Sequence, residues 1–387
     1  MNIPRTVDVV IVGAGIVGCC AAEAMARAGL KVVLLDKGAI GSGVSGASLS
    51  CVGTHMVSTE EIAVLQRGAS LWAEVEVRMG CDIEYHAGGQ LRFVAHEADR
   101  PAAESWVAAE REQGCRVELL EPDEVRRIVP ALEGPIACAS WSSDDATVNP
   151  FLACRAYAGA ATAAGAHVLP HTAVNELLHN GNRVTGVATD SGTINCAWVV
   201  NAAGSWARRI ASMAGVDVPI HPRKAQCLAT VSLPPKIPCV VGACESAGGV
   251  EAGYTQIQQT RSGQVLFNTV LGGGERPEGT QDIDQAVDHA FVVDSVRTLL
   301  WLFPGLAKAD LLRSWARYEA VTPDERFLIG PMPDCDGLLM AAGDSGTGFT
   351  RAPVIAEMLA AHATDGASPL PLDPYRPDRF AHTREVE

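Results

Sequence analysis

The sequence of 387 residues predicts an α/β fold, α+β overall, with one parallel sheet assembled from discontinuous segments and a second domain built on a mixed sheet. Three observations predict it. An apolar strand at 7–12 runs into a glycine turn and a helix, and two further glycine turns, near 204 and 346, also follow apolar strands and precede helices. Amphipathic segments separate them. Because ligands bind at the carboxyl ends of parallel strands, we expect the three turns to meet at one sheet edge.

The first segment, 7–36, reads as strand, tight turn, helix and second strand. Gly13, Gly15 and Gly18 fit the pattern G-x-G-x-x-G, in which the glycines permit the turn, the approach of a pyrophosphate and the packing of helix on strand. Asp36 ends the second strand, 18 residues after Gly18 (36 minus 18), where a carboxylate accepts hydrogen bonds from ribose hydroxyls. The segment predicts a dinucleotide site rather than a purely structural βαβ unit. It does not distinguish NAD from FAD.

The loop from Lys37 to Met56 follows this acid directly and is rich in Gly and Ser. Backbone N–H groups and the hydroxyls of Ser42, Ser45 and Ser48 suit phosphates or a polar ring edge, and the alternative is a flexible surface loop. His55 lies at the end of the loop. Its alternatives are a structural histidine with satisfied hydrogen bonds and a catalytic or cofactor-contacting one.

The next region is expected to begin the second domain, because it shows no phosphate-binding features. Apolar residues recur every three and four positions at 60–80 and 97–114, which predicts two helices. Between them, residues 83–96 read as a hairpin around Gly88 and Gly89.

The segment after Asp145 returns to the first domain. Residues 151–166 predict a small-residue helix, and a three-stranded meander follows at 171–178, 183–189 and 193–204. Ala203 and Gly204 end this last run, where they allow close backbone approach to the cofactor.

From 219 to 323 the second domain is expected to resume. It contains strands at 255–260 and 264–270, a glycine loop at 271–279 and an amphipathic helix at 286–303 that Pro304 ends. The chain then returns to an apolar strand and glycine turn at 338–349 and a helix at 352–361. The predicted domains are therefore a nucleotide-binding domain of 1–56, 145–218 and 324–366, a substrate-binding domain of 57–144 and 219–323, and a C-terminal tail of 367–387.

Composition excludes several classes of function. The net charge of −15, with no Lys/Arg-rich run, argues against nucleic acid and anionic membrane surfaces as partners. No run of eighteen apolar residues predicts a membrane span, and the glycine-interrupted N-terminus reads as a folded strand rather than a signal peptide, so we expect a cytoplasmic protein. The twelve cysteines are scattered without a C-x-x-C motif, and we expect reduced, buried thiols and no metal site.

Several motifs in this order resemble the FAD-dependent amine and amino-acid oxidoreductases related to D-amino-acid oxidase, glycine oxidase and sarcosine oxidase. The resemblance spans nearly the whole chain. The motifs are VDVVIVGAGIVG with Asp36, DDATVNPFLACRAYAGAATAAGAHV, WVVNAAGSWA, TPDERFLIGPMP and LLMAAGDSGTGF.

The resemblance implies a Rossmann-like FAD-binding domain and assigns residues to it. The first glycine turn and Asp36 would hold the ADP half of FAD, Val174 would contact the adenine, and the last turn would offer N–H donors to the flavin where negative charge builds up on reduction. The predicted cofactor-binding residues are Gly13, Gly15, Gly18, Asp36, Lys37, Ser42, Ser45, Ser48, Val174, Ala203, Gly204, Gly343, Asp344, Ser345, Gly346, Thr347, Gly348, Phe349 and Thr350.

Two departures from the family pattern bear on cofactor and substrate. Arg317 stands where monomeric sarcosine oxidases carry the cysteine that links the flavin, which implies noncovalent FAD. Glu319 stands where glycine oxidase-like members carry the arginine that clamps the substrate carboxylate. Glu319 is expected either to meet a cationic group, such as the substrate amine or a guanidinium, or to pair structurally with Arg313 or Arg317. Tyr254 and His55 are the other candidate catalytic residues.

The glutamate and the Gly/Ser-rich loop further resemble the FAD-bearing β subunits of dehydrogenases that act on opines or hydroxyproline. Such subunits imply hydride transfer from an amine to flavin N5, an imine that hydrolyses, electron-accepting partner subunits, and FMN at a subunit interface in some complexes. The alternatives are a self-contained glycine or D-amino-acid oxidase that makes hydrogen peroxide, an NAD-dependent dehydrogenase, and a noncatalytic flavoprotein subunit in which FAD serves structure or electron relay.

Overall fold

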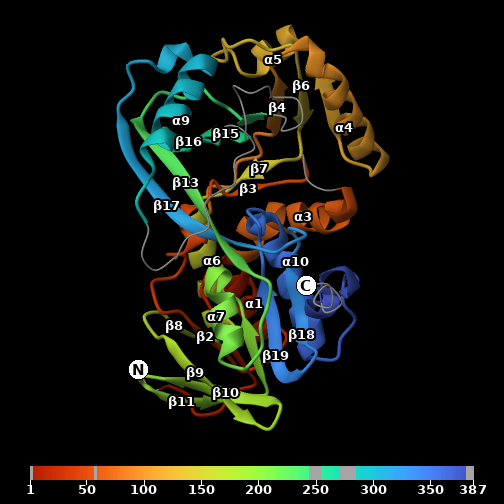
Figure 1. Cartoon of the computed structure of the whole chain (residues 1–387), viewed down its shortest axis with the longest axis vertical. Coiled ribbons are helices and arrows are strands. Elements are labelled where there is room, and N and C mark those ends of the chain that lie inside the picture. The colour runs from red at the N-terminus through yellow and green to blue at the C-terminus, as the bar shows by residue number, and fades with distance from the viewer. Residues whose placement is uncertain (1–2, 56–58, 244–253, 271–284, 381–387) are drawn as a thin grey trace, which may run out of the picture.

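The chain folds around two large sheets, which occupy the lower and upper halves of the view in Figure 1. The structure is a computed structural model, and it describes residues 3–55, 59–243, 254–270 and 285–380. The predicted α/β architecture with a second, mixed sheet is confirmed. The predicted loop at 271–279 lies outside the described residues.

The first sheet has nine strands and gathers segments from three separated parts of the chain. Its main order is β11-β10-β19-β12-β1-β2-β8, with β18 on β19 and β9 on β10. The pairs β19–β12, β12–β1, β1–β2 and β2–β8 are parallel. The strands are β1 (Val9–Val12), β2 (Val32–Leu35), β8 (His167–Leu169), β9 (Val174–Asn180), β10 (Arg183–Thr189), β11 (Gly192–Asn195), β12 (Trp198–Asn201), β18 (Leu328–Met332) and β19 (Cys335–Ala342).

Parallel pairing in register places the three glycine turns at one edge of this sheet. Ile11 of β1 lies opposite Val200 of β12, which in turn lies opposite Leu339 of β19. The chain leaves each strand at its carboxyl end and enters a helix, so the turns after β1, β12 and β19 meet. The helices that follow are α1 (Ile16–Arg27), the short η3 (Gly204–Trp206) with α7 (Ala207–Ser212), and α10 (Gly348–Ala363).

Small side chains let the helices pack closely over this sheet. In α1, Cys19, Cys20, Ala21 and Ala22 are fully buried, and the helix packs between α10 and α6 (Pro150–Ala163). Asn149 caps α6, because its side chain accepts hydrogen bonds from the N–H groups of two first-turn residues. The central strands are buried on both faces, as their continuous β-branched runs predict.

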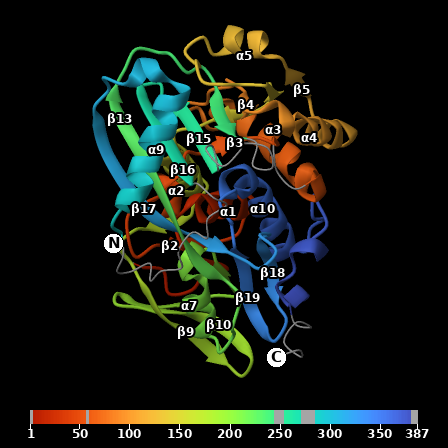
Figure 2. The same cartoon turned by 45° about the horizontal axis from the view of Figure 1, so that its top comes forward.

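The second sheet has eight strands in the order β17-β13-β16-β15-β14-β4-β6-β5. Only β14 and β4 pair in parallel among its described strands, so the sheet is mixed. The strands are β4 (Gln90–Val94), β5 (Val117–Leu120), β6 (Cys138–Ser142), β13 (His221–Ser232), β14 (Val240–Ala243), β15 (Tyr254–Gln259), β16 (Gln264–Val270) and β17 (Leu311–Val321). The long strands β13 and β17 run side by side toward the first sheet, as both views show (Figures 1 and 2).

Helices cover the second sheet and fill the space between the sheets. The helix α9 packs on β16, and α3 packs on α10 between the two halves of the molecule (Figure 1). The remaining elements are β3 (Cys51–Val52) paired with β7 (Ala146–Thr147), α2 (Val44–Ala47), α3 (Ile62–Met79), α4 (Arg100–Glu112), α5 (Pro122–Ile128) and α9 (His289–Leu302), with 3-10 turns η1 (Thr59–Glu61), η2 (Glu97–Asp99), η4 (Pro304–Leu306) and η5 (Asp373–Tyr375).

Two predictions from the sequence are wrong. Residues 83–96 do not form a hairpin, because β4 pairs with β6 and β14 instead. The glycine pair serves close packing rather than a hairpin turn: a methyl group at Gly88 would lie 2.4 Å from the carbonyl oxygen of Pro238, and one at Gly89 would lie 2.2 Å from the Trp141 ring. The last run of the meander, 193–204, divides into β11, which pairs with β10, and β12, which joins β1.

The C-terminal segment lies on the surface but is anchored. Tyr375 is buried, and the guanidinium of Arg379 pairs with the carboxylate of Asp324 at 2.8 Å. No helix in the part of the chain that the structure describes is long and apolar enough to cross a bilayer.

Substituting Gly18 tests the packing of the first turn. A methyl group there would lie 1.8 Å from the carbonyl oxygen of Gly13, so we expect Gly18→Ala to lower the free energy of unfolding by about 1–3 kcal/mol and to weaken retention of the cofactor. Gly159→Ala, in exposed space on α6, is the matched control and should stabilise by about 0.5 kcal/mol. Chemical denaturation of both variants measures this, and equal stabilities would contradict the packing role.

Candidate active site

One cavity of about 820 Å³ joins the three glycine turns to the second sheet. Its lining combines the carboxyl ends of β1, β12 and β19, the serine loop after β2, and side chains of β13, β15, β16 and β17. The cavity therefore has two parts. The glycine turns line one part mainly with backbone, and the second sheet lines the other with side chains.

The first glycine turn is held tightly between its neighbours. Gly13 donates its N–H to the carbonyl of Leu35 at 2.7 Å, and it adopts a φ of +110°. A methyl group at Gly13 would lie 2.4 Å from the carbonyl oxygen of Ala202, so only glycine fits. Gly18 does not line the cavity among the described residues; it lets α1 approach Gly13, which is the packing role that the sequence indicates.

Asp36 is oriented by two backbone donors. Its Oδ2 accepts the N–H of Ala14 at 2.6 Å, and its Oδ1 accepts the N–H of Gly38 at 2.7 Å. These bonds tie the second strand to the glycine turn and hold the carboxylate at the cavity wall, where it can accept further hydrogen bonds. Beside it, the Lys37 ammonium lies 3.8 Å from the centre of the Trp206 ring.

The predicted serine loop lies against the cavity rather than on the outer surface. Ser42, Ser45 and Ser48 all belong to the lining. Ser45 accepts the N–H of Ile16 at 3.0 Å, so this side chain fixes the start of α1.

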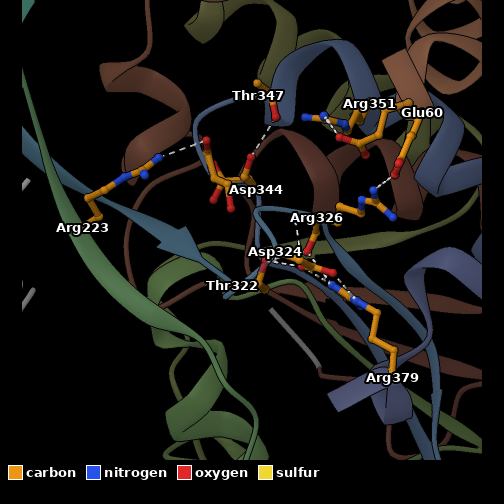
Figure 3. Close-up of polar contacts among 11 residues, drawn as sticks. Glu60, Arg223, Thr322, Asp324, Arg326, Asp344, Thr347, Arg351 and Arg379 are labelled. Carbon is orange, nitrogen blue, oxygen red and sulfur yellow. Dashed lines mark hydrogen bonds and ion pairs between the residues drawn. The ribbon is translucent and has the colours of Figure 1, made fainter. Parts of the chain in front are cut away.

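The third turn, 343–348, contributes most of its residues to the lining. The φ angles of Gly343 and Gly346 are +95° and +90°, and that of Ser345 is +44°. Thr347 donates both its N–H and its hydroxyl to the carbonyl of Asp344 and so closes the turn (Figure 3). Ser345 and Thr350, both predicted to bind cofactor, lie outside the cavity lining among the described residues.

Ser345 and Thr350 have positioning contacts instead. The carbonyl of Ser345 accepts a hydrogen bond from Arg223 at 3.1 Å, and the hydroxyl of Thr350 accepts the N–H of Gly53 at 3.1 Å. These contacts anchor the two ends of the turn to neighbouring segments.

Glu319 lines the cavity, is 7% exposed, and pairs with an arginine that the sequence analysis did not name. The Nε atom of Arg223 lies 3.1 Å from Glu319 Oε2. The two residues face each other across the antiparallel pair β13–β17. This ion pair matches the structural alternative in kind, but the arginine is Arg223 of β13 in place of the expected Arg313 or Arg317. Only the pairing of β13 with β17, which lie about a hundred residues apart in the sequence, reveals this contact between Arg223 and Glu319.

The second-sheet part of the cavity is lined by neutral polar side chains together with charged ones. Tyr254 lines it, as predicted, and its hydroxyl donates to Gln256 Oε1 at 3.3 Å. Gln256 in turn donates to Gln258 at 3.3 Å, and Asn268 accepts the N–H of Gln256 at 3.2 Å. Arg317 also lines the cavity, with its Nη1 on the side-chain oxygen of Gln285 at 3.0 Å.

His55 is not part of the cavity lining among the described residues, which argues against the predicted catalytic role. Its Nδ1 lies 2.8 Å from Glu110 and its Nε2 lies 2.8 Å from the hydroxyl of Ser140. Both ring nitrogens are engaged in a buried network between α4 and β6, and the side chain is 3% exposed. His55 fits the structural alternative.

The donor set of the first part fits FAD. The turn at Gly13 and Gly15 lines the cavity beside the amino end of α1, whose N-cap residue, Gly15, has no side chain to occupy the space of a pyrophosphate. Asp36 lines the cavity and lies at the sequence spacing from the glycine motif that is usual for a ribose-binding acid. Val174 and Ala203 line the cavity too. Among the described cysteines no disulfide forms, and no cluster of metal-ligating side chains occurs in the part of the chain the structure covers.

Comparisons with known proteins agree with this geometry. The family model described as FAD dependent oxidoreductase (DAO) matches residues 8–362. Hydrogen cyanide synthase subunit HcnC of Pseudomonas aeruginosa is 27% identical over 97% of this chain and 97% of its own. Glycine oxidase of Bacillus licheniformis is 27% identical, with 91% and 92% covered. Sarcosine oxidase subunit beta of Rhodobacter capsulatus is 26% identical, with 94% and 86% covered.

A solved structure matches the whole architecture. L-proline dehydrogenase from P. horikoshii superimposes with a TM-score of 0.90 and 29% sequence identity, and the match covers 98% of this chain and 99% of that one.

Removing the charge of Asp36 tests the first part of the site. Asp36→Asn replaces one acceptor oxygen by a donor that faces a backbone N–H, so we expect FAD binding to weaken by about 1.5–3 kcal/mol, roughly 10- to 100-fold. Titration of the apoprotein with FAD, followed by quenching of flavin fluorescence, measures the dissociation constant. Asp8→Asn is the matched control, because Asp8 accepts the N–H of Lys31 at the amino end of β1. Equal FAD affinities in the two variants would refute the assignment of Asp36.

Proposed function

We propose, from the premise that the chain belongs to the DAO family of FAD dependent oxidoreductases, that it oxidises a secondary amine or amino acid, such as an opine or hydroxyproline, and passes the electrons to partner subunits. Its cofactor is FAD, and the residue at the flavin-linking position, Arg317, supports noncovalent binding. When bound, FAD supplies the acceptor for the hydride that leaves the substrate carbon. The product imine hydrolyses in water.

The single observation that carries this proposal is the continuity of the cavity. Gly13 and Gly15, most residues of the turn 343–348, and the side chains of Tyr254, Gln256 and Glu319 line one space of about 820 Å³. A cofactor held by the turns and a small polar substrate held by the second sheet would therefore share one enclosure. Such an enclosure excludes water from a reactive carbon and orients it.

The negative charge of Glu319 supports a substrate that is bound through its amine rather than a glycine-like substrate whose carboxylate is clamped at this position. A carboxylate cannot clamp a carboxylate, and Arg223 already occupies one of its oxygens. Two relatives support this class by name, sarcosine oxidase subunit beta and L-proline dehydrogenase, whereas glycine oxidase supports amine oxidation in general. Sarcosine and proline are secondary amines. Within this proposal Glu319 and Tyr254 bind or orient the amine.

The proposal of partner subunits rests on relatives that are named as subunits. Hydrogen cyanide synthase subunit HcnC and sarcosine oxidase subunit beta match over most of this chain. FMN at a subunit interface stays a prediction from the resemblance. A self-contained oxidase and a noncatalytic flavoprotein subunit are the alternatives that experiment must separate.

Anaerobic mixing tests the proposed reaction directly. We expect purified, flavin-loaded protein to lose its absorbance near 450 nm when it meets its substrate, because reduction removes the oxidised flavin chromophore. The screen includes opines, both hydroxyproline isomers, proline, sarcosine and D-amino acids. A protein that carries FAD and is bleached by dithionite, yet by none of these amines, would support the noncatalytic alternative.

Oxygen consumption separates the dehydrogenase from the oxidase. With the bleaching amine, we expect slow turnover in air and at least tenfold faster turnover with an artificial acceptor such as a phenazine dye. Brisk oxygen uptake with stoichiometric hydrogen peroxide from the isolated chain would contradict the partner-subunit version and favour the oxidase.

A further inference from the structure

The turn 343–348 is held against the second sheet by two hydrogen bonds to one residue of β17, Ala320. Ala320 donates its N–H to Asp344 Oδ1 at 3.0 Å, and its carbonyl accepts the N–H of Ser345 at 2.9 Å. Arg223 adds a third contact, from Nη2 to the carbonyl of Ser345 at 3.1 Å (Figure 3). The side chain of Asp344 therefore lies where the two halves of the cavity meet.

Several carboxyl groups lie near Arg223 at this junction. Arg223 is shared between Glu319, at 3.1 Å, and the exposed Glu325, at 2.7 Å. Glu319 lies against the turn, because a methyl group at Gly346 would be 3.1 Å from its Oε1. Asp344 is a third carboxyl in the same cluster. Arg223 is already shared by the two glutamates, so a third carboxyl beside them favours an added cation or a proton.

Asp344 and Glu319 both line the cavity, and Asp344 is the more exposed of the two. Asp344 is half-buried, whereas Glu319 is almost fully buried and held by Arg223. Among the described residues, the Asp344 side chain accepts one hydrogen bond from another residue, that from Ala320 to Oδ1. An ionised carboxylate has about four lone-pair sites, so Asp344 can still accept a hydrogen bond from a ligand in the cavity besides those from Ala320 and from its own backbone N–H.

The surroundings of Asp344 favour its protonated form. Loss of solvent raises the pKa of Asp344 to about 6, with a further contribution from the negative charge of Glu319. The hydrogen bond from Ala320 and the charge of Arg223 oppose the rise in pKa. The neighbouring ion pairs Arg326–Glu60 and Arg379–Asp324 are each internally compensated and hold residues of the 322–326 loop (Figure 3).

We propose that Asp344, supported by Glu319, accepts the proton that the substrate ammonium must lose before the amine is oxidised. The inference rests on the proposed function and adds a named base to it. In this step one N–H bond of the ammonium breaks and one O–H bond forms at Asp344. The nitrogen keeps its electron pair and becomes neutral, and no electrons are transferred. The lone pair then assists departure of the hydride from the adjacent carbon.

The negative cluster performs two tasks in this scheme. Before the proton moves, Asp344 and Glu319 attract the cationic amine into the cavity. After it moves, the negative charge of Asp344 is removed, so the neutral amine and the neutral acid face each other next to Glu319. A base whose pKa lies near the working pH is suited to this exchange.

Titration of the carboxyl itself tests the inference without any substrate. In flavin-loaded protein labelled with 13C at the aspartate carboxyls, we expect one resonance to titrate near pH 6 and to vanish in Asp344→Asn. Glu319→Gln removes the nearby negative charge and should lower that midpoint, whereas Arg223→Gln removes the cation and should raise it. Absence of a resonance that titrates near pH 6 and vanishes in Asp344→Asn would overturn the inference.

The pH dependence of anaerobic flavin reduction tests the role in the reaction. With the amine that bleaches the wild type, we expect the reduction rate constant to fall below about pH 6 as Asp344 becomes protonated. Asp344→Asn should remove this acid limb and slow reduction by about 100-fold or more. Asparagine keeps an oxygen for the Ala320 N–H, so the turn remains docked and FAD affinity should be unchanged.

The outcomes separate the inference from the proposed function. Bleaching by an amine with the same rate and pH profile in wild type and Asp344→Asn would overturn the inference and leave the function intact. Normal FAD binding without bleaching by any amine would overturn both. Loss of FAD from Asp344→Asn, with its recovery in Asp344→Glu but no recovery of the acid limb, would assign Asp344 a purely structural role and overturn the inference.

Discussion

Parallel pairing of β1, β12 and β19 is the constraint on which the rest of the site depends. These strands come from three distant parts of the chain, yet Ile11, Val200 and Leu339 lie in register across the sheet. Their burial on both faces fixes this register, because a slip by one residue would exchange the faces of every side chain. Each strand then delivers its glycine turn to the same edge, and the cofactor site follows from topology rather than from any single motif.

A second constraint joins this edge to the other sheet. The long strands β13 and β17 carry Arg223 and Glu319 to the turn 343–348, where Ala320 pairs with it through both backbone groups. The same contacts that position the turn also gather three carboxyls around one guanidinium. Structure and chemistry are thus coupled at this junction: the residues that dock the turn also set the charge that an incoming amine meets.

The sequence predicts the first half of the site well, because local rules determine it. Gly13 and Asp36 are recognisable from the order of strand, turn, helix and acid, and the structure places both at the cavity. The resemblance to a known family extends this to the last glycine turn. The wrong hairpin at 83–96 has a physical cause, since Gly88 and Gly89 are required by Pro238 and Trp141, which lie far away in sequence.

The second half of the site could not be predicted from local sequence, because it depends on pairing between distant strands. Nothing near Arg223 in the sequence indicates that it lies opposite Glu319. His55 follows a glycine-rich loop as a cofactor-contacting histidine would, but Glu110 and Ser140 hold it in the core. The family resemblance places the backbone of the turn that contains Asp344 at the cofactor, and only the folded cavity shows that the Asp344 side chain lies at the junction with the second sheet.

A crystal structure of the protein purified with its flavin, soaked with an unreactive amine, tests the central claim most directly. We expect the adenosine to lie at Asp36 and Val174, the ring system to reach the turn 343–348, and the amine nitrogen to lie within hydrogen-bond distance of the Asp344 carboxylate. Flavin bound elsewhere, or an amine held away from Asp344 and Glu319, would contradict it.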